Sequence, residues 1–169
     1  MASAGSVAGG AMSSMVTCAH HGPRRVPVSD AADVEEANAR FYRAFEALDL
    51  AEMDRVWAHD EHVRCVHPGW ALLEGWEAVR QSWEAIFKGS GEMRFSLGDV
   101  QARVIGDAGW VTCAENILSQ VRGNIAVTAL VATNVFERQG GEWRMVLHHA
   151  SHVLAGAPPA DREEDARGA

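Results

Sequence analysis

The sequence predicts an α+β domain in which three N-terminal helices pack on a strongly curved antiparallel sheet. In the first half of the chain, apolar residues recur at the spacing of amphipathic helices. From Met93 onward the period changes to two, in runs that short Gly-bearing breaks separate. Such short connections make neighbouring strands antiparallel. Because the helices come first, a long sheet is expected to curl around them and leave an apolar pocket at its wide end.

The first two helices are each marked by an acidic cap. Asp33, with Glu36 three residues later, resembles a capping box, so an amphipathic helix is expected over Val34–Ala47. Asp49 and Glu52 repeat this pattern and predict a second, short helix.

The remaining elements follow from alternation and from turn residues. A short strand is expected at residues 63–67, ended by Pro68-Gly69. A third helix is expected from Gly75, and Gly98 predicts a bulge in the strand that follows it. The apolar face of the third helix comprises Trp76, Val79, Trp83, Ile86 and Phe87. The long strands are expected at Met93–Ile105, Trp110–Gln120, Ile125–Arg138 and Trp143–Leu154.

Composition divides the chain into a domain and two polar ends. Residues 1–29 and 156–169 lack apolar periodicity, so we expect a disordered leader and a disordered tail around a domain at residues 30–155. The formal net charge of −8 argues against nucleic acid as a partner. No apolar run has the length of a membrane span, and the three cysteines show no pairing pattern. A cytoplasmic protein with no membrane partner is therefore expected.

The order of the elements resembles the nuclear transport factor 2-like superfamily, and within it the SnoaL-like and ketosteroid isomerase-like domains. The segments that carry the resemblance are Phe41–Met53, His67–Gly69, Gly75–Val79, Thr133–Phe136 and Trp143–Val146. The resemblance implies a cone-shaped fold over residues 30–154, with a hydrophobic pocket. It does not define an activity, because this fold carries several chemistries and also non-catalytic modules.

Comparison with the ketosteroid isomerases implies where a site would lie. Their carboxylate base corresponds to His67, their helical Tyr to Phe41, and their late-strand Asp to Asn134. Tyr42 is one residue removed from the Tyr position and is expected to point elsewhere. Because Phe41 has no proton to donate, the resemblance argues against steroid isomerisation.

His67 and Asn134 are the candidate catalytic residues. A histidine can move a proton near neutral pH, and a buried amide can stabilise an oxyanion. We expect both side chains to line one apolar cavity, although a strand-end histidine can also be only a hydrogen-bonded rim residue. Asn116 is expected on the same cavity wall, but a one-residue register error would exchange it for Glu115. The expected substrate-binding residues are Phe41, Trp57, Asn116, Phe136 and His148.

No cofactor or metal is expected, although one metal arrangement stays open. His148 and His152 share one strand face, while His149 lies on the other, and His67 would be a third ligand only if the last strand passes near it. The sequence offers no pair of ligands at helical spacing to support such a site.

Two classes of function remain open. The first is binding of a small apolar molecule, with isomerase- or lyase-type proton transfer. The alternative is a non-catalytic dimeric scaffold or interaction module of the same fold. In either case the alternate face of the strand at Ile125–Arg138 is apolar enough to predict a homodimer through the sheet.

Overall fold

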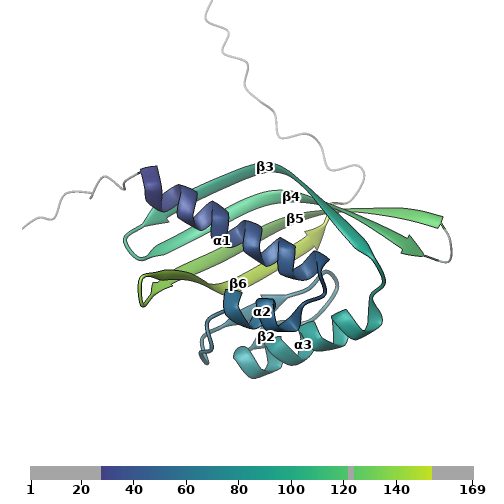
Figure 1. The fold of residues 1–169 in the computed structure, drawn as a ribbon, viewed down its shortest axis with the longest axis horizontal. Helices are drawn as coiled ribbons and strands as arrows, with labels where there is room; N and C mark the ends of the chain where they lie inside the picture. The colour runs from purple at the N-terminus through teal and green to yellow at the C-terminus, as the bar shows by residue number, and fades with distance from the viewer. Residues whose placement is uncertain (1–27, 122–123, 154–169) are drawn as a thin grey trace, which may run out of the picture.

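The computed structural model describes residues 28–121 and 124–153, and over these it is an α+β fold with three helices and one six-stranded sheet. Figure 1 shows α1 lying across one face of the long strands, with α2 and α3 at one end of the sheet. The predicted leader and tail lie outside the described residues, apart from the first two residues of α1. The helices are α1 (Val28–Glu46), α2 (Leu50–Val56) and α3 (Trp76–Gly89). The strands are β1 (Arg64–Val66), β2 (Leu73–Glu74), β3 (Met93–Ile105), β4 (Ala108–Val121), β5 (Asn124–Gln139) and β6 (Glu142–His152).

The sheet is mixed rather than purely antiparallel, which corrects the prediction. Its order is β2-β1-β6-β5-β4-β3, and β3 to β6 form the predicted antiparallel meander. The short strand β1 pairs in parallel with β6, with Cys65 opposite His148. The strand β2 was not predicted, because two residues are too short to show alternation. Since β1 and β2 precede α3, the three helices are not all N-terminal to the strands. The strong curvature of the sheet stays a prediction.

The caps of the first two helices differ in outcome. Asp49 caps α2 as predicted, because its Oδ1 accepts hydrogen bonds from the backbone N–H groups of Ala51 (2.9 Å) and Glu52 (3.0 Å). Asp33, in contrast, lies inside α1, which begins at Val28. The helix extends in the N-terminal direction because Ala31 still packs against the core.

The inner face of the sheet decides which side chains meet the helices. On β5 the predicted inner residues Leu130, Ala132, Asn134 and Phe136 are buried. On β4 the prediction was wrong by one residue, and Val111, Cys113 and Glu115 face inward.

Gly109 marks the side of β4 that faces α1. A Cβ atom at Gly109 would come within 2.8 Å of the Val34 side chain, so this side of β4 touches α1 directly. The same alternation turns Asn116 toward the outer face.

The long strand β3 carries the predicted irregularity. Its register with β4 shifts between Gly98 and Gln101, and Asp99 takes a positive φ of 50°. None of the helices in the described ranges is long and apolar enough to cross a membrane.

Candidate functional site

Six buried polar residues lie in the space between the helices and the inner face of the sheet. Each buried polar group costs free energy unless it is hydrogen-bonded, and apolar residues of similar size would pack there at lower cost. A core that keeps such a set departs from what stability alone favours, which marks it as a candidate site. The six residues are Asn38, His67, Ser82, Glu115, Asn134 and His148.

His67 follows β1 and is enclosed on several sides, with only 4% of its surface exposed. Its ring meets the rings of Trp83 and Trp70 edge-on, at centroid distances of 4.6 and 5.0 Å. Its Nε2 lies 2.9 Å from Oγ of Ser82. Because that hydroxyl donates its own proton to the carbonyl of Val79 (2.6 Å), it accepts from His67. Nε2 of His67 therefore carries the proton, and Nδ1 holds the lone pair.

His148 on β6 takes the opposite tautomer. It lies directly across from Asn134 on β5, and its Nδ1 is 2.7 Å from Oδ1 of that amide. A carbonyl oxygen only accepts, so Nδ1 of His148 is protonated and Nε2 holds the lone pair. The Nδ2 group of Asn134 donates to Oδ1 of Asn38 (2.7 Å) and to the hydroxyl of Tyr42 (3.4 Å).

The two imidazoles form a pair around one indole. Their ring centroids are 6.2 Å apart, and the ring of Trp83 lies 4.6 Å from His67 and 5.8 Å from His148. Burial lowers the pKa of His67 to about 4. Burial, followed by the neighbouring His67 and His149, lowers the pKa of His148 to about 3. Both rings are therefore neutral at neutral pH, and each has one nitrogen able to accept a proton.

A second group of polar side chains continues from Asn134. The hydroxyl of Tyr42 donates to Oε1 of Glu115 and lies 3.3 Å from Sγ of Cys113. Burial raises the pKa of Glu115, and burial followed by the charges of Glu115 and Cys113 raises that of Tyr42.

Sequence reasoning missed both Tyr42 and Glu115. The signal for Tyr42 was its spacing of four residues from Asn38, which places the two on neighbouring turns of one helix face. For Glu115 the only signal was the alternative register of β4, in which Glu115 rather than Asn116 faces inward, and the structure shows Glu115 buried.

The structure brings most of the predicted site residues together. Phe41 is fully buried, with its ring 5.0 Å from that of His148 and 5.5 Å from that of Trp83. Phe136 is also fully buried, on the inner face of β5 next to Asn134. Asn116 does not join them, because it lies half-buried on the outer face.

The histidines of the last strand do not converge. His148 points inward, whereas His149 and His152 are exposed.

Trp57 is fully buried, and its indole N–H contacts the sulfur of Met53 at 3.3 Å.

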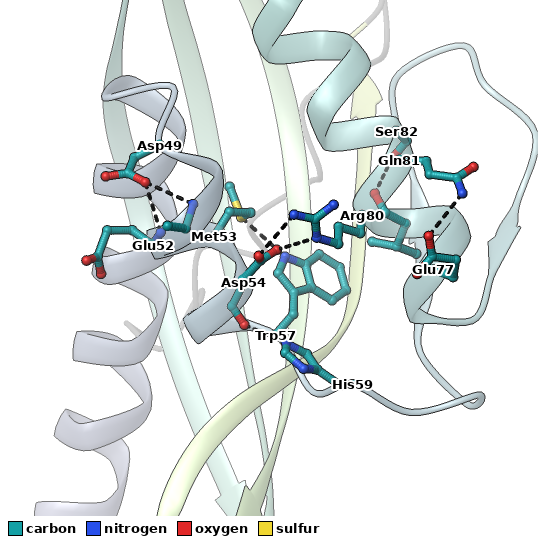
Figure 2. Close-up of polar contacts among 12 residues, drawn as sticks. Asp49, Glu52, Met53, Asp54, Trp57, His59, Glu77, Arg80, Gln81 and Ser82 are labelled. Carbon is teal, nitrogen blue, oxygen red and sulfur yellow. Dashed lines mark hydrogen bonds and ion pairs between the residues drawn. The ribbon is translucent and has the colours of Figure 1, made fainter.

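An ion pair joins α2 to α3, the helix that carries Ser82. Figure 2 shows the side chain of Arg80 on α3 reaching that of Asp54 on α2, with N–O distances of 3.0 and 3.3 Å. The pair is only partly exposed, at 34% for Arg80 and 29% for Asp54. Ser82, the partner of His67, lies two residues after Arg80 on the same helix.

Three clefts on the described surface are lined by residues other than His67 and His148. They have volumes of about 390, 410 and 290 Å³ and lie near α2 and along α1. Of the predicted site residues, Trp57 borders the first cleft. Aromatic rings occupy the space around His67 and His148 instead.

Within the described residues, two buried indole N–H groups have no hydrogen-bond partner, on Trp83 and on Trp143. Only Trp83 lies against the histidines, whereas Trp143 packs beneath the guanidinium of Arg138.

Comparison with known proteins gives relatives for most of the chain. A protein from Streptomyces avermitilis, provisionally assigned as a dehydratase of the NTF2-like family, is 36% identical with a TM-score of 0.73 over 77% of this chain and all of its own (100%). A provisional calcium/calmodulin-dependent protein kinase type II association domain from Thiobacillus denitrificans is 38% identical with a TM-score of 0.65, over 71% of this chain and 94% of its own.

A plant relative is longer than this chain. The F-box protein SKIP8 of Arabidopsis thaliana is 32% identical over 117 residues, which are 69% of this chain and 48% of that protein. The chain thus spans about half the length of this curated relative.

The SnoaL-like domain family matches residues 34–155, which are most of the described fold and contain all six buried polar residues. The chain therefore belongs to the SnoaL-like domain family.

Proposed function

We propose that this domain binds a small apolar molecule with a carbonyl oxygen and moves a proton at the carbon next to that carbonyl. The observation that carries the proposal is the pair of neutral imidazoles, 6.2 Å apart, each with its tautomer set by a hydrogen bond. A general base must be neutral, oriented and close to the reacting carbon. Burial supplies the first condition for both rings, and the bonds to Ser82 and Asn134 supply the second.

His148 is the better candidate for the base. Its Nδ1 is held by Asn134, which leaves Nε2 with a lone pair, and the ring packs against Phe41 and Trp83. The hydrogen bond from Nδ1 to the amide oxygen also supports the imidazolium that forms when Nε2 takes a proton. His67 is the second neutral imidazole of the site.

Asn134 takes a different role from the one the sequence indicated. An amide N–H stabilises an oxyanion only if it is free to donate to the ligand. Here Nδ2 of Asn134 already donates to Asn38 and Tyr42. Asn134 therefore orients His148. The donor available for a ligand oxygen is the unpartnered indole N–H of Trp83, which a carbonyl group would satisfy.

The proposed step is a reversible enolisation. Nε2 of His148 takes a proton from the carbon beside the carbonyl, and the electron pair of that C–H bond moves toward the carbonyl oxygen. Return of the proton to another carbon gives isomerisation. Loss of a hydroxyl group from the next carbon, with that proton, gives dehydration, the class assigned provisionally to the Streptomyces relative.

Entry requires an aromatic side chain to move. Trp70 is 48% exposed and lies edge-on against His67, so it separates the histidine pair from solvent. An apolar ligand that displaces Trp70 keeps the histidines out of water, as proton transfer by a buried base requires.

The test is exchange of carbon-bound hydrogen. The full chain is incubated in D₂O with a panel of cyclic ketones and hydroxyketones, and deuterium incorporation beside the carbonyl is followed by NMR. We expect His148→Gln to lose the enzyme-dependent exchange, on the order of 100-fold or more. His149→Gln, a neighbouring exposed histidine of the same strand, is the matched control and keeps it. No exchange and no ligand-induced shift at His148 with any ketone contradicts the proposal.

A scaffold function is the second candidate, and the aromatic packing around His67 and His148 favours it. Rings rather than open space surround His67 and His148, and the Thiobacillus relative is provisionally an association domain. In that case a homodimer through the outer face of the sheet is the functional unit. His148→Phe then keeps assembly, with a stability loss of about 1–3 kcal/mol because Oδ1 of Asn134 loses its donor, whereas the enzyme proposal gives loss of exchange.

A further inference from the structure

We infer that Glu115 and Tyr42 are positioning residues that set, through Asn134, which nitrogen of His148 carries the proton. Neither residue contacts the imidazole. The consequence of this inference for catalysis rests on the proposed function. The positions of the hydrogens are inferred from the contacts alone.

The first step is the contact at the far end of the chain of hydrogen bonds. Glu115 is 2% exposed, on the inner face of β4, and its Oε1 accepts the hydroxyl proton of Tyr42. A hydroxyl group has one proton, so once it is used on Glu115 the oxygen of Tyr42 can only accept from other groups. Sγ of Cys113, 3.3 Å from the same hydroxyl, is a much weaker acceptor and does not compete with a carboxyl oxygen.

The second step concerns the amide of Asn134. The oxygen of Tyr42 can accept only from the NH₂ end of that amide, which is 3.4 Å away. The amide oxygen is thereby turned to the other side, toward His148. Asn38 does not impose this direction by itself, because its own amide can turn and present either an oxygen or an NH₂ group.

The third step fixes the imidazole. With an amide oxygen 2.7 Å from Nδ1, His148 must donate from Nδ1 and keep its lone pair on Nε2. All the donors therefore run in one direction, from His148 to Asn134, from Asn134 to Tyr42, and from Tyr42 to Glu115. Aligned hydrogen bonds polarise one another, so each bond of this chain strengthens its neighbours.

Without an acceptor at position 115, this direction is no longer enforced. The hydroxyl of Tyr42 is then free to donate to Oδ1 of Asn134, and the amide turns its NH₂ group toward His148. The imidazole accepts at Nδ1 and carries its proton on Nε2. In that state the nitrogen proposed to take a proton is already occupied.

The experiment reads the tautomers directly. The full chain is labelled with ¹⁵N, and long-range ¹H–¹⁵N spectra assign the protonated nitrogen of His67 and His148. In the wild type we expect Nδ1 protonated on His148 and Nε2 protonated on His67. Glu115→Leu removes the acceptor and is expected to move the proton of His148 to Nε2 in at least about half of the molecules. Glu115→Gln, whose amide oxygen still accepts, is expected to restore the wild-type tautomer.

A matched control lies in the same spectra. Ser82→Ala removes the hydrogen bond at His67 and is expected to change His67 while leaving His148 as it is. Tyr42→Phe breaks the relay by loss of a single oxygen, and it keeps the inference testable if Glu115→Leu does not fold. We expect mixed tautomers of His148 in that variant.

The results separate the two claims. An unchanged His148 tautomer in a folded Glu115→Leu or Tyr42→Phe chain overturns the inference, whatever the exchange assay shows. A shifted tautomer together with exchange that His148→Gln does not affect supports the relay and rejects His148 as the base. If both claims hold, Glu115→Leu lowers the exchange rate by about 100-fold and Glu115→Gln restores it.

Discussion

Cys65 lies opposite His148 in the parallel pair of β1 and β6, and this pairing brings His67, two residues further on, to a ring distance of 6.2 Å from His148. The two histidines are far apart in the sequence and lie on opposite sides of α3 in chain order. The parallel contact between the short strand β1 and the last strand, β6, makes them neighbours.

The buried histidines should make the fold sensitive to acid. Histidine titrates near 6.5 in the unfolded chain, whereas burial lowers the pKa to about 4 for His67 and about 3 for His148. The full unfolding free energy is retained above pH 6.5, where both histidines are neutral in the folded and in the unfolded chain. It is lost as the pH falls toward the folded values, because only the unfolded chain binds the protons. Each histidine contributes a slope of about 1.4 kcal/mol per pH unit in that window.

Chemical denaturation between pH 6 and pH 4.5 checks this expectation. The double variant His67→Gln, His148→Gln is compared with the wild type, so that the other titrating groups cancel. We expect a shallower loss of unfolding free energy in the variant. Equal slopes would show that these histidines are not buried neutral.

Trp83 should be the most costly single aromatic residue to remove. Its ring is fully buried and packs against Phe41, Phe45 and both histidines. Trp83→Ala is expected to lower the unfolding free energy by about 3–5 kcal/mol. Trp70→Ala, at a tryptophan that is 48% exposed, is expected to cost less than about 1 kcal/mol. Similar costs for the two variants in urea unfolding would contradict the packing described for α3.

Asn134 and Asn116 offer a matched test of the two sheet faces. Asn134→Ala leaves Asn38, Tyr42 and His148 without their shared partner, and each unsatisfied buried group costs about 1–3 kcal/mol. Asn116→Ala changes a half-buried residue of the outer face and is expected to cost less than about 1 kcal/mol. A larger loss at Asn116 in thermal or urea unfolding would mean that the register of β4 is wrong.

The outer face of the sheet should bind a second copy of the chain. Val127 and Val131 of β5 are 64% and 49% exposed on that face, next to Leu118 of β4 at 40%. Apolar side chains gathered on a sheet face mark an interface, and a two-fold dimer is the commonest closed assembly. Light scattering at micromolar concentration should give the mass of a dimer, and Val131→Lys should give that of a monomer.

A control variant distinguishes loss of this interface from a general effect of adding positive charge to the surface. Ile105→Lys, at the end of β3 where the side chain is 69% exposed, is expected to keep the dimer. A wild-type chain with the mass of a monomer at every concentration removes the interface, and with it the scaffold candidate in its dimeric form.

Several features could be read from the sequence because they depend on local periodicity and turn chemistry. The apolar spacing of α3, the Asp49 cap of α2 and the short breaks of the meander each involve residues close in the chain. The inward direction of Asn134 and Phe136 also followed from simple alternation within one strand. The same local reasoning supplied the family resemblance, and the match over residues 34–155 confirms it.

Tertiary contacts decided the site itself. Alternation has a period of two, so it cannot choose between two registers of β4. In the folded chain α1 lies against Gly109, and on the same side of β4 Glu115 faces inward, while Asn116 faces outward. The pairing of β1 with β6 joins residues separated by most of the domain, and no local pattern encodes such a contact. The tautomer of His148 depends on the far end of a hydrogen-bond chain through Asn134 and Tyr42. The sequence alone predicted the three helices and the long strands, and it supplied His67 and Asn134 as candidates. Their partners and orientation follow only from how helices and strands pack, because hydrogen bonds depend on proximity in space.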